Sequence, residues 1–168
     1  MLLDRRLDGT TANAAIAQLL LLEAQDQSGE IRIVVNAAGG ELTAGLALHD
    51  VMRRCVAPVS TVCFGQATGI AVLALAGGAR GRRFIAPDAS VRLELGRVEN
   101  AGRVADLEAW RAELETLSLR FARALAEDCG HHVEEVEHDL DRGRVLDAAA
   151  AVVYGIVDTV LQGREPIT

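Results

Sequence analysis

The chain has 168 residues, of which 50% are hydrophobic, and a formal net charge of −7. Its 17 basic residues are all arginines and form no basic run, which argues against nucleic acid as the main partner. The three cysteines are odd in number and lack metal-ligand spacing, so we expect small buried thiols in a reducing, cytoplasmic compartment. We expect no signal peptide, and Pro58, Gln66 and several glycines interrupt the uncharged stretch 56–79, which argues against a membrane span.

The first third of the chain alternates predicted helices with a predicted strand, a pattern typical of βαβ units. The β-branched run at 31–35 predicts a strand that is buried on both faces at its end. The expected order is a helix from Thr10 or Thr11 to about Asp26, a turn at 28–29, the strand at 31–35, a Gly39-Gly40 loop and a helix over 41–54.

The next stretch, 59–78, predicts a strand that runs directly into a helix. We expect the strand at 59–64, a tight turn at 65–67 and an apolar helix over 68–76. Such a turn lies at the rim of a sheet, where the unpaired N–H groups of the first helical turn face the adjacent crevice. A nucleophile often occupies this kind of elbow, but the sequence there is Thr68-Gly69-Ile70 and the expected nucleophile is missing.

The second half of the chain is dominated by a long helix that we expect from about 101 to 128. Its apolar residues recur at spacings of three and four and form one continuous seam: Leu107, Trp110, Leu114, Leu117, Phe121 and Leu125. The other predicted elements are strands at 83–86 and 91–95, an acidic helix at 133–141, and a final helix that Asp147 caps and Gly155 ends. No linker divides the chain, which predicts one α/β domain over 1–168.

Several short motifs recur in an order and spacing that resemble one family. They are Val35-Asn36-x-x-Gly39-Gly40, Val59-Ser60-Thr61 with Gly65-Gln66-Ala67, Ala76-x-Gly78-Ala79-x-Gly81-x-Arg83-Phe84, Asp139-x-Asp141-Arg142 and Tyr154-Gly155-x-x-Asp158. Taken together they make the chain resemble the proteolytic subunit of the Clp protease, within the Clp/crotonase superfamily. The resemblance implies an α/β fold of repeated βαβ units with a protruding handle helix, which corresponds to about 101–128.

The resemblance implies a Ser–His–Asp triad, yet none of its three positions holds the required side chain. The serine position falls on Gly69, the histidine position on Glu94 and the aspartate position on Gly143. A glycine cannot be acylated, so we expect the hydrolysis typical of the family to be absent. The family's two backbone oxyanion donors correspond to the N–H groups of Gly40 and Ile70, which could still bind a carbonyl oxygen.

Two other chemistries stay open. Thr68, with Glu94 as its base, is the best relocated nucleophile for a peptide or acyl hydrolase that uses the surviving oxyanion hole. A crotonase-like acyl-CoA enzyme is the third hypothesis, although no adenine or pantetheine site is visible. The segment 131–139 contains three histidines among acidic residues, and we favour a solvated acidic cluster over a metal site, so no metal or cofactor is expected. His49 is expected at the surface or at an interface.

The resemblance also implies assembly, because the family forms heptameric rings that the handle helix stacks into a tetradecamer. We therefore expect self-assembly, or assembly with an active paralogue. Asp106 and Arg142 occupy the positions of the family's ring–ring ion pairs, and Trp110 lies on the apolar seam of the handle. The chain starts after the family's N-terminal axial hairpin, which we expect to be absent.

The family's docking pocket for the AAA+ unfoldase is expected to be altered. Its positions correspond to Arg32, Val34 and Arg54, with Phe84 and Leu161 retained. Two arginines in an apolar slot carry a desolvation penalty that a hydrophobic loop cannot offset, so we expect weak or no unfoldase binding. The leading hypothesis is a non-catalytic Clp-type subunit with a scaffold or regulatory role.

Overall fold

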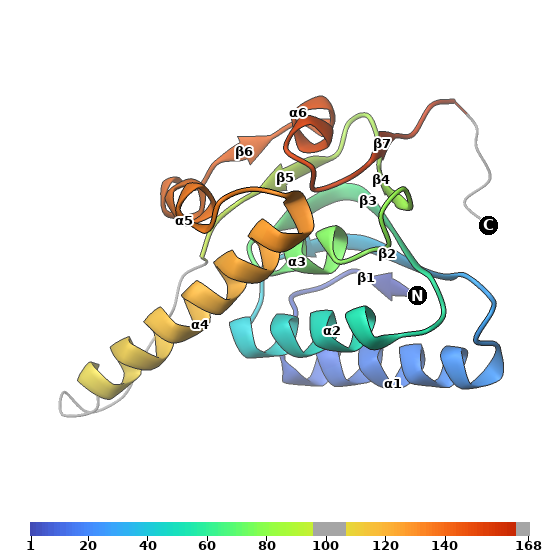
Figure 1. Ribbon diagram of the computed structural model, residues 1–168, viewed down its shortest axis with the longest axis horizontal. Helices are drawn as coiled ribbons and strands as arrows, with labels where there is room; N and C mark the ends of the chain where they lie inside the picture. The colour runs from blue at the N-terminus through green and yellow to red at the C-terminus, as the bar shows by residue number, and fades with distance from the viewer. Residues whose placement is uncertain (96–106, 164–168) are drawn as a thin grey trace.

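The computed structural model describes residues 1–95 and 107–163, which form an α/β fold (Figure 1). Its strands are β1 (Leu2–Leu3), β2 (Ile31–Ala38), β3 (Val59–Thr68), β4 (Arg83–Ile85), β5 (Ser90–Arg92), β6 (Val145–Leu146) and β7 (Thr159–Val160). The order β1-β2-β3-β4-β7 runs through the sheet with every pair parallel, while β5 pairs with β3 and, antiparallel, with β6. Parallel strands joined by helices confirm the predicted α/β class.

Helices cover the sheet and one of them extends away from it. They are α1 (Gly9–Gln25), α2 (Leu42–Arg54), α3 (Ala71–Ala76), α4 (Leu107–Cys129), α5 (Val133–Arg142) and α6 (Ala148–Val153). Figure 1 shows α1 and α2 side by side, and the first turns of α4 reaching beyond the rest of the fold. The apolar helix α3 contacts β2, β3, α2 and α4, and all of its residues are buried, so it forms the centre of the core.

The helix predicted from about 101 to 128 is α4, which ends at Cys129. Residues 101–106 of that prediction lie outside the described residues. Burial of the apolar seam increases toward the C-terminal end of the helix: Leu114 and Leu117 are half-buried, whereas Phe121 and Leu125 are fully buried. The part of α4 that packs on the body is therefore its C-terminal half.

The first helix begins earlier than predicted. Its N-cap is Asp8, whose side chain accepts a hydrogen bond from the backbone N–H of Thr11 at 2.7 Å. Asp8 has the extended backbone that an N-cap requires, and its carboxylate satisfies one of the free N–H groups of the first turn. The prediction of Thr10 or Thr11 as the cap was wrong by a few residues.

Burial alternates along β2 instead of covering both faces at its end as predicted. Ile31, Ile33 and Val35 are buried, while Arg32 and Val34 between them are half-buried. Helices α1 and α3 contact this strand, so one of its faces packs into the core and the other stays partly open.

The strand that leads into the elbow is longer than predicted, because a bulge carries it past the expected turn. Gly65 has a φ of +73°, and the register of β2 against β3 shifts at this point. Pairing then resumes: Thr68 lies opposite Ala38 in β2 and Arg92 in β5. The chain turns at Gly69-Ile70, and α3 starts at Ala71.

His49 is buried within the chain, whereas we expected it at the surface or at an interface. Its Nε2 lies 2.8 Å from Oδ2 of Asp128, near the end of α4, and the same carboxylate accepts a hydrogen bond from Arg53 at 3.0 Å. A partner that lies 79 residues away in the sequence supplies the compensation that a buried imidazole needs. No pattern within α2 could have indicated it.

Candidate functional site at the strand–helix elbow

The elbow is bent at Gly69, in a conformation that favours glycine. Gly69 has a φ of +54° and is buried. Its N–H donates to the carbonyl oxygen of Arg92 at 2.9 Å, and its own carbonyl oxygen accepts from the N–H of Val72 at 3.0 Å. The backbone thus passes from the sheet into α3 with a sharp turn, as at a nucleophile elbow, but no side chain is attached at the bend.

Glu94 flanks this bend. A Cβ atom at Gly69 would lie 3.2 Å from the carbonyl oxygen and 3.8 Å from Cγ of Glu94, and 3.7 Å from Cα of Gly39. The structure therefore brings the predicted serine position next to the predicted histidine position and next to the Gly39-Gly40 loop. The side chain at the base position is a half-buried carboxylate.

Gly143 is linked to the same segment through the backbone. It is the C-cap of α5 and has a φ of +65°, and the carbonyl oxygen of the next residue, Arg144, accepts a hydrogen bond from the N–H of Leu93 at 2.8 Å. A Cβ atom at Gly143 would meet nothing within 4 Å. Of the three predicted triad positions, Glu94 thus lies in the segment 92–95, Gly69 contacts it, and Gly143 is joined to it through the next residue, Arg144.

The two predicted oxyanion donors have free N–H groups. Within the described residues, neither the N–H of Gly40 nor that of Ile70 donates a hydrogen bond to another backbone carbonyl. Leu7 holds the Gly40 loop through two backbone hydrogen bonds. Its N–H donates to the carbonyl oxygen of Gly39 at 3.0 Å, and its carbonyl oxygen accepts from the N–H of Glu41 at 2.7 Å. Two free backbone donors beside the elbow can stabilise a carbonyl oxygen or its oxyanion.

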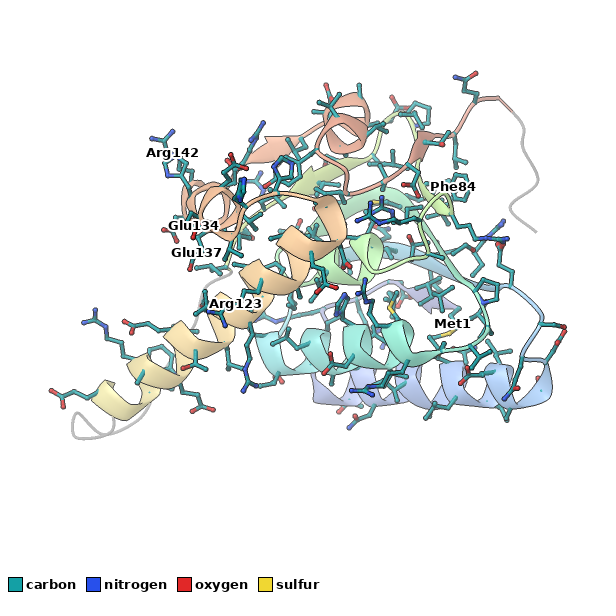
Figure 2. The ribbon with its side chains drawn as sticks, in the orientation of Figure 1. Met1, Phe84, Arg123, Glu134, Glu137 and Arg142 are labelled. Carbon is teal, nitrogen blue, oxygen red and sulfur yellow. The ribbon has the colours of Figure 1, made fainter. Side chains whose placement is uncertain are left out.

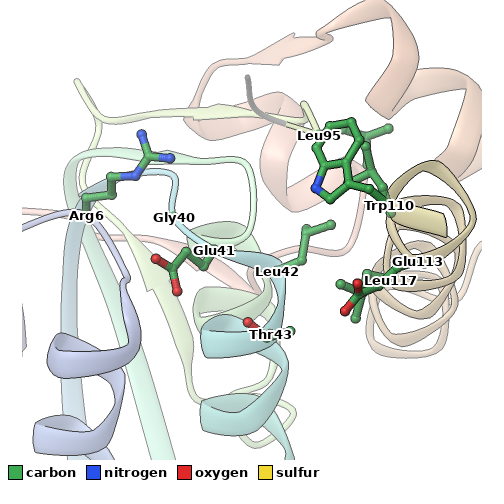
Figure 3. Close-up of a pocket in the computed structure, with 10 residues that line it drawn as sticks. Arg6, Gly40, Glu41, Leu42, Thr43, Leu95, Trp110, Glu113 and Leu117 are labelled. Carbon is green, nitrogen blue, oxygen red and sulfur yellow. The ribbon is translucent and has the colours of Figure 1, made fainter. Parts of the chain in front are cut away.

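A cavity of about 650 Å³ opens beside Gly40 (Figure 3). The start of α2 and Arg6 form one wall, and Leu95 and α4 form the other. Trp110 belongs to the α4 wall, so the residue predicted for a ring–ring contact also lines this cavity. Arg6, Leu95 and Glu113 could not be predicted here from the sequence, because periodicity along α4 does not tell where that helix lies relative to the sheet.

The thiols offer no alternative nucleophile near the elbow. Burial raises the pKa of Cys63 to about 12, and burial together with Glu23 raises that of Cys55 to about 11. Burial and the charge of Asp128 raise the pKa of Cys129 to about 12, against the smaller opposing effect of two arginines. All three therefore stay protonated at neutral pH, and a thiol is a weak nucleophile.

Comparison with known proteins decides the family. The Clp protease family model matches residues 1–164. The chain belongs to the Clp protease family. It is 38% identical over 164 residues to the ATP-dependent Clp protease proteolytic subunit 1 of Corynebacterium glutamicum. The aligned residues make up 97% of this chain and 79% of that relative. The family resemblance and the Clp/crotonase type of fold are thus confirmed.

The remaining predicted site residues are Thr68, beside the elbow, and the two residues of the predicted ring–ring ion pair, Arg142 and Asp106. Thr68 is the last residue of β3 and is 9% exposed. Arg142 is exposed in the last turn of α5 (Figure 2), and Asp106 lies outside the described residues. The ring–ring ion pair between the last two stays a prediction.

The histidine-rich segment is held together by ordinary polar contacts. The ring of His131 stacks on Tyr154 with 4.2 Å between centroids, and its nitrogens lie 3.2 Å from Glu135 and 3.1 Å from the carbonyl oxygen of Tyr154. His132 and His138 are exposed. Across residues 1–95 and 107–163, no three metal-binding side chains come together, and no helix is long and apolar enough to cross a membrane.

Proposed function

We propose that this chain is a non-catalytic subunit of the Clp protease family. The observation that carries the proposal is the buried Gly69 at the elbow, where the backbone has the bend that presents a nucleophile and no side chain is attached. Glu94 beside it and Gly143 at the end of α5 agree with this, since neither is the residue of a Ser–His–Asp triad. Without an attacking oxygen, the free N–H groups can bind a carbonyl but cannot cleave it.

The proposed role is that of a scaffold or regulatory subunit in a cytoplasmic heptameric or tetradecameric ring, alone or with an active paralogue. The handle-like α4 supports this, because its first turns extend from the body (Figure 1). Trp110, Leu114 and Leu117 on this helix are partly exposed on the isolated chain. A partly exposed apolar seam on a projecting helix is suited to contact with a second subunit. We further propose that residues 1–168 form one domain.

Weak or absent binding to the AAA+ unfoldase is part of the proposal. Arg32, at a position of the family's docking pocket, lies 2.8 Å from Glu30 and donates to Ser60 at 3.2 Å. Its charge is therefore held on the open face of the sheet by a polar network. A hydrophobic loop that docked there would have to desolvate this network.

The first test is labelling with a fluorophosphonate probe, which reacts with an activated hydroxyl. We expect no labelling and no peptide hydrolysis above background, because no activated hydroxyl lies at the elbow. The Thr68→Ala variant should behave identically. Labelling of the wild-type protein that disappears in Thr68→Ala would contradict the proposal and favour the alternative, a hydrolase with Thr68 as its relocated nucleophile.

The second test is the native mass. We expect a species near seven or fourteen subunits, and we expect Trp110→Ala to weaken the assembly by about 2 kcal/mol or more, as for a buried aromatic anchor at an interface. Leu21→Ala, at a 58% exposed position on α1, serves as the control and should assemble normally. A wild-type protein that sediments as a monomer at micromolar concentration, with no active paralogue recovered alongside it, would contradict the ring proposal.

A further inference from the structure

A second cavity lies between α2 and α4, away from the elbow. Its volume is about 500 Å³, and it shares no lining residue with the cavity beside Gly40. All of its lining residues come from these two helices, and the charged ones are Asp50, Arg53, Arg54, Arg120, Arg123 and Glu127. Apart from Arg54, which corresponds to a position of the family's unfoldase pocket, the proposed function makes no use of these residues.

This second cavity is basic, although the chain as a whole is acidic. Four of the 17 arginines line it, against Asp50 and Glu127 as its two acidic residues, within a chain of net charge −7. Arg53 is already neutralised, because it contacts Glu127 at 2.6 Å and Asp128 at 3.0 Å. The positive charge available to a ligand therefore belongs to the other three arginines, which outnumber the one remaining carboxylate of the lining, that of Asp50.

Those three arginines are without partners in the part of the chain that the structure describes. Arg54, Arg120 and Arg123 form no ion pair or hydrogen bond there, and each is exposed. Arg120 and Arg123 are three residues apart, so they lie on the same face of α4 (Arg123 is labelled in Figure 2). Like charges around one concavity repel one another, and a bound anion would relieve that repulsion.

We propose that this cavity is a binding site for a small ligand with two or more phosphate groups. Guanidinium groups bind phosphate oxygens in a bidentate manner and stay charged at any physiological pH. The cavity volume is within the range of small-molecule sites, which favours a small polyanion over an acidic macromolecule. The lining contains no Trp, Tyr or Phe, and its one aromatic ring, that of His49, is buried against Asp128, so we expect the site to recognise the phosphates and not a base.

The test is a titration of the full chain with sodium tripolyphosphate at low ionic strength, followed by calorimetry and by thermal unfolding. We expect saturable binding and a rise in the unfolding temperature that sodium chloride of equal ionic strength does not reproduce. The affinity of Arg120→Gln/Arg123→Gln for tripolyphosphate should be lower by about tenfold or more, since each substitution removes a charge-assisted hydrogen bond. Arg111→Gln is the matched control: it lies on the same helix, pairs with Glu115 and does not line the cavity, so its affinity should equal that of the wild type.

A charge-conserving variant separates geometry from charge. Arg120→Lys/Arg123→Lys keeps both positive charges but loses the planar fork, and we expect an affinity between those of the wild type and the glutamine variant. Absence of saturable binding, or equal affinity in the wild type and Arg120→Gln/Arg123→Gln, would overturn the proposal. Tighter binding of a glutamate-rich peptide than of tripolyphosphate would also overturn it, in favour of an acidic protein partner. None of these results bears on the elbow.

Discussion

Restoring all three triad side chains, in Gly69→Ser/Glu94→His/Gly143→Asp, should give a protein that a fluorophosphonate probe labels. Gly69→Ser alone should stay unlabelled. The elbow still has the bend that presents a nucleophile, and the N–H groups of Gly40 and Ile70 are free, so the missing parts are the side chains. Loss of a working triad lowers kcat by roughly 10⁶-fold in a serine protease, and this is the largest gain in kcat that restoring the triad could give.

The single variant fails for a reason that the triple variant removes: a carboxylate at position 94 lacks the imidazole that accepts and returns the proton. The serine at a φ of +54° costs about 1–2 kcal/mol, and its Cβ would lie 3.2 Å from the carbonyl oxygen of Glu94, but both variants bear this strain equally. Labelling of Gly69→Ser alone would indicate that Glu94 can act as the base. The absence of a side chain at residue 69 would then be the only remaining reason to call the chain non-catalytic. Gly69→Ala has the same backbone strain without the hydroxyl and is the control.

Replacement of Arg83 by methionine should destabilise the fold by about 3–5 kcal/mol, the largest stability effect that we expect. Arg83 is 4% exposed and donates to both oxygens of Asp158, at 2.6 and 3.1 Å. It also donates to three carbonyl oxygens, those of Ala76, Asp128 and Gly155. Its removal leaves a partly buried carboxylate and carbonyl groups without their donor.

Thermal unfolding measures this effect, and a loss of about 10 °C in unfolding temperature is expected for a chain of this size. Arg82→Met is the neighbouring control, because Arg82 is half exposed and its pair with Glu30 lies at the surface; it should cost about 1 kcal/mol or less. An Arg83→Met protein as stable as Arg82→Met would show that the buried network contributes little.

The same ion pair predicts a dependence of stability on pH. Burial alone would raise the pKa of Asp158, but hydrogen bonds from the side chain and the backbone N–H of Arg83 outweigh burial and hold the pKa below its ordinary value. Since the folded-state pKa is depressed, the stabilisation is complete above the unfolded pKa of about 3.9 and is lost as the pH falls through the folded value. In Asp158→Asn this part of the acid-induced loss of stability should disappear.

Much of the elbow could be predicted from the sequence, because its signals are local. The β-branched run before the bend and the apolar run after it predicted a strand and a helix, and the motif order pointed to the family that the comparisons confirm. The alignment of motifs also placed Gly69 and Glu94 at corresponding positions, and the structure brings these two residues together. The bulge at Gly65 was missed, since a register shift is a property of two strands and not of one.

The sequence by itself determined the fold class, the family and the absence of a serine at the bend, because each depends on residue identity or on patterns within a single segment. Only the tertiary structure decided which distant groups meet. His49 became a buried partner of Asp128, Trp110 became the wall of a cavity beside Gly40, and arginines from α2 and α4 came to surround one concavity. The physical reason is that charge compensation and cavity shape depend on the packing of helices against one another, which no local periodicity specifies.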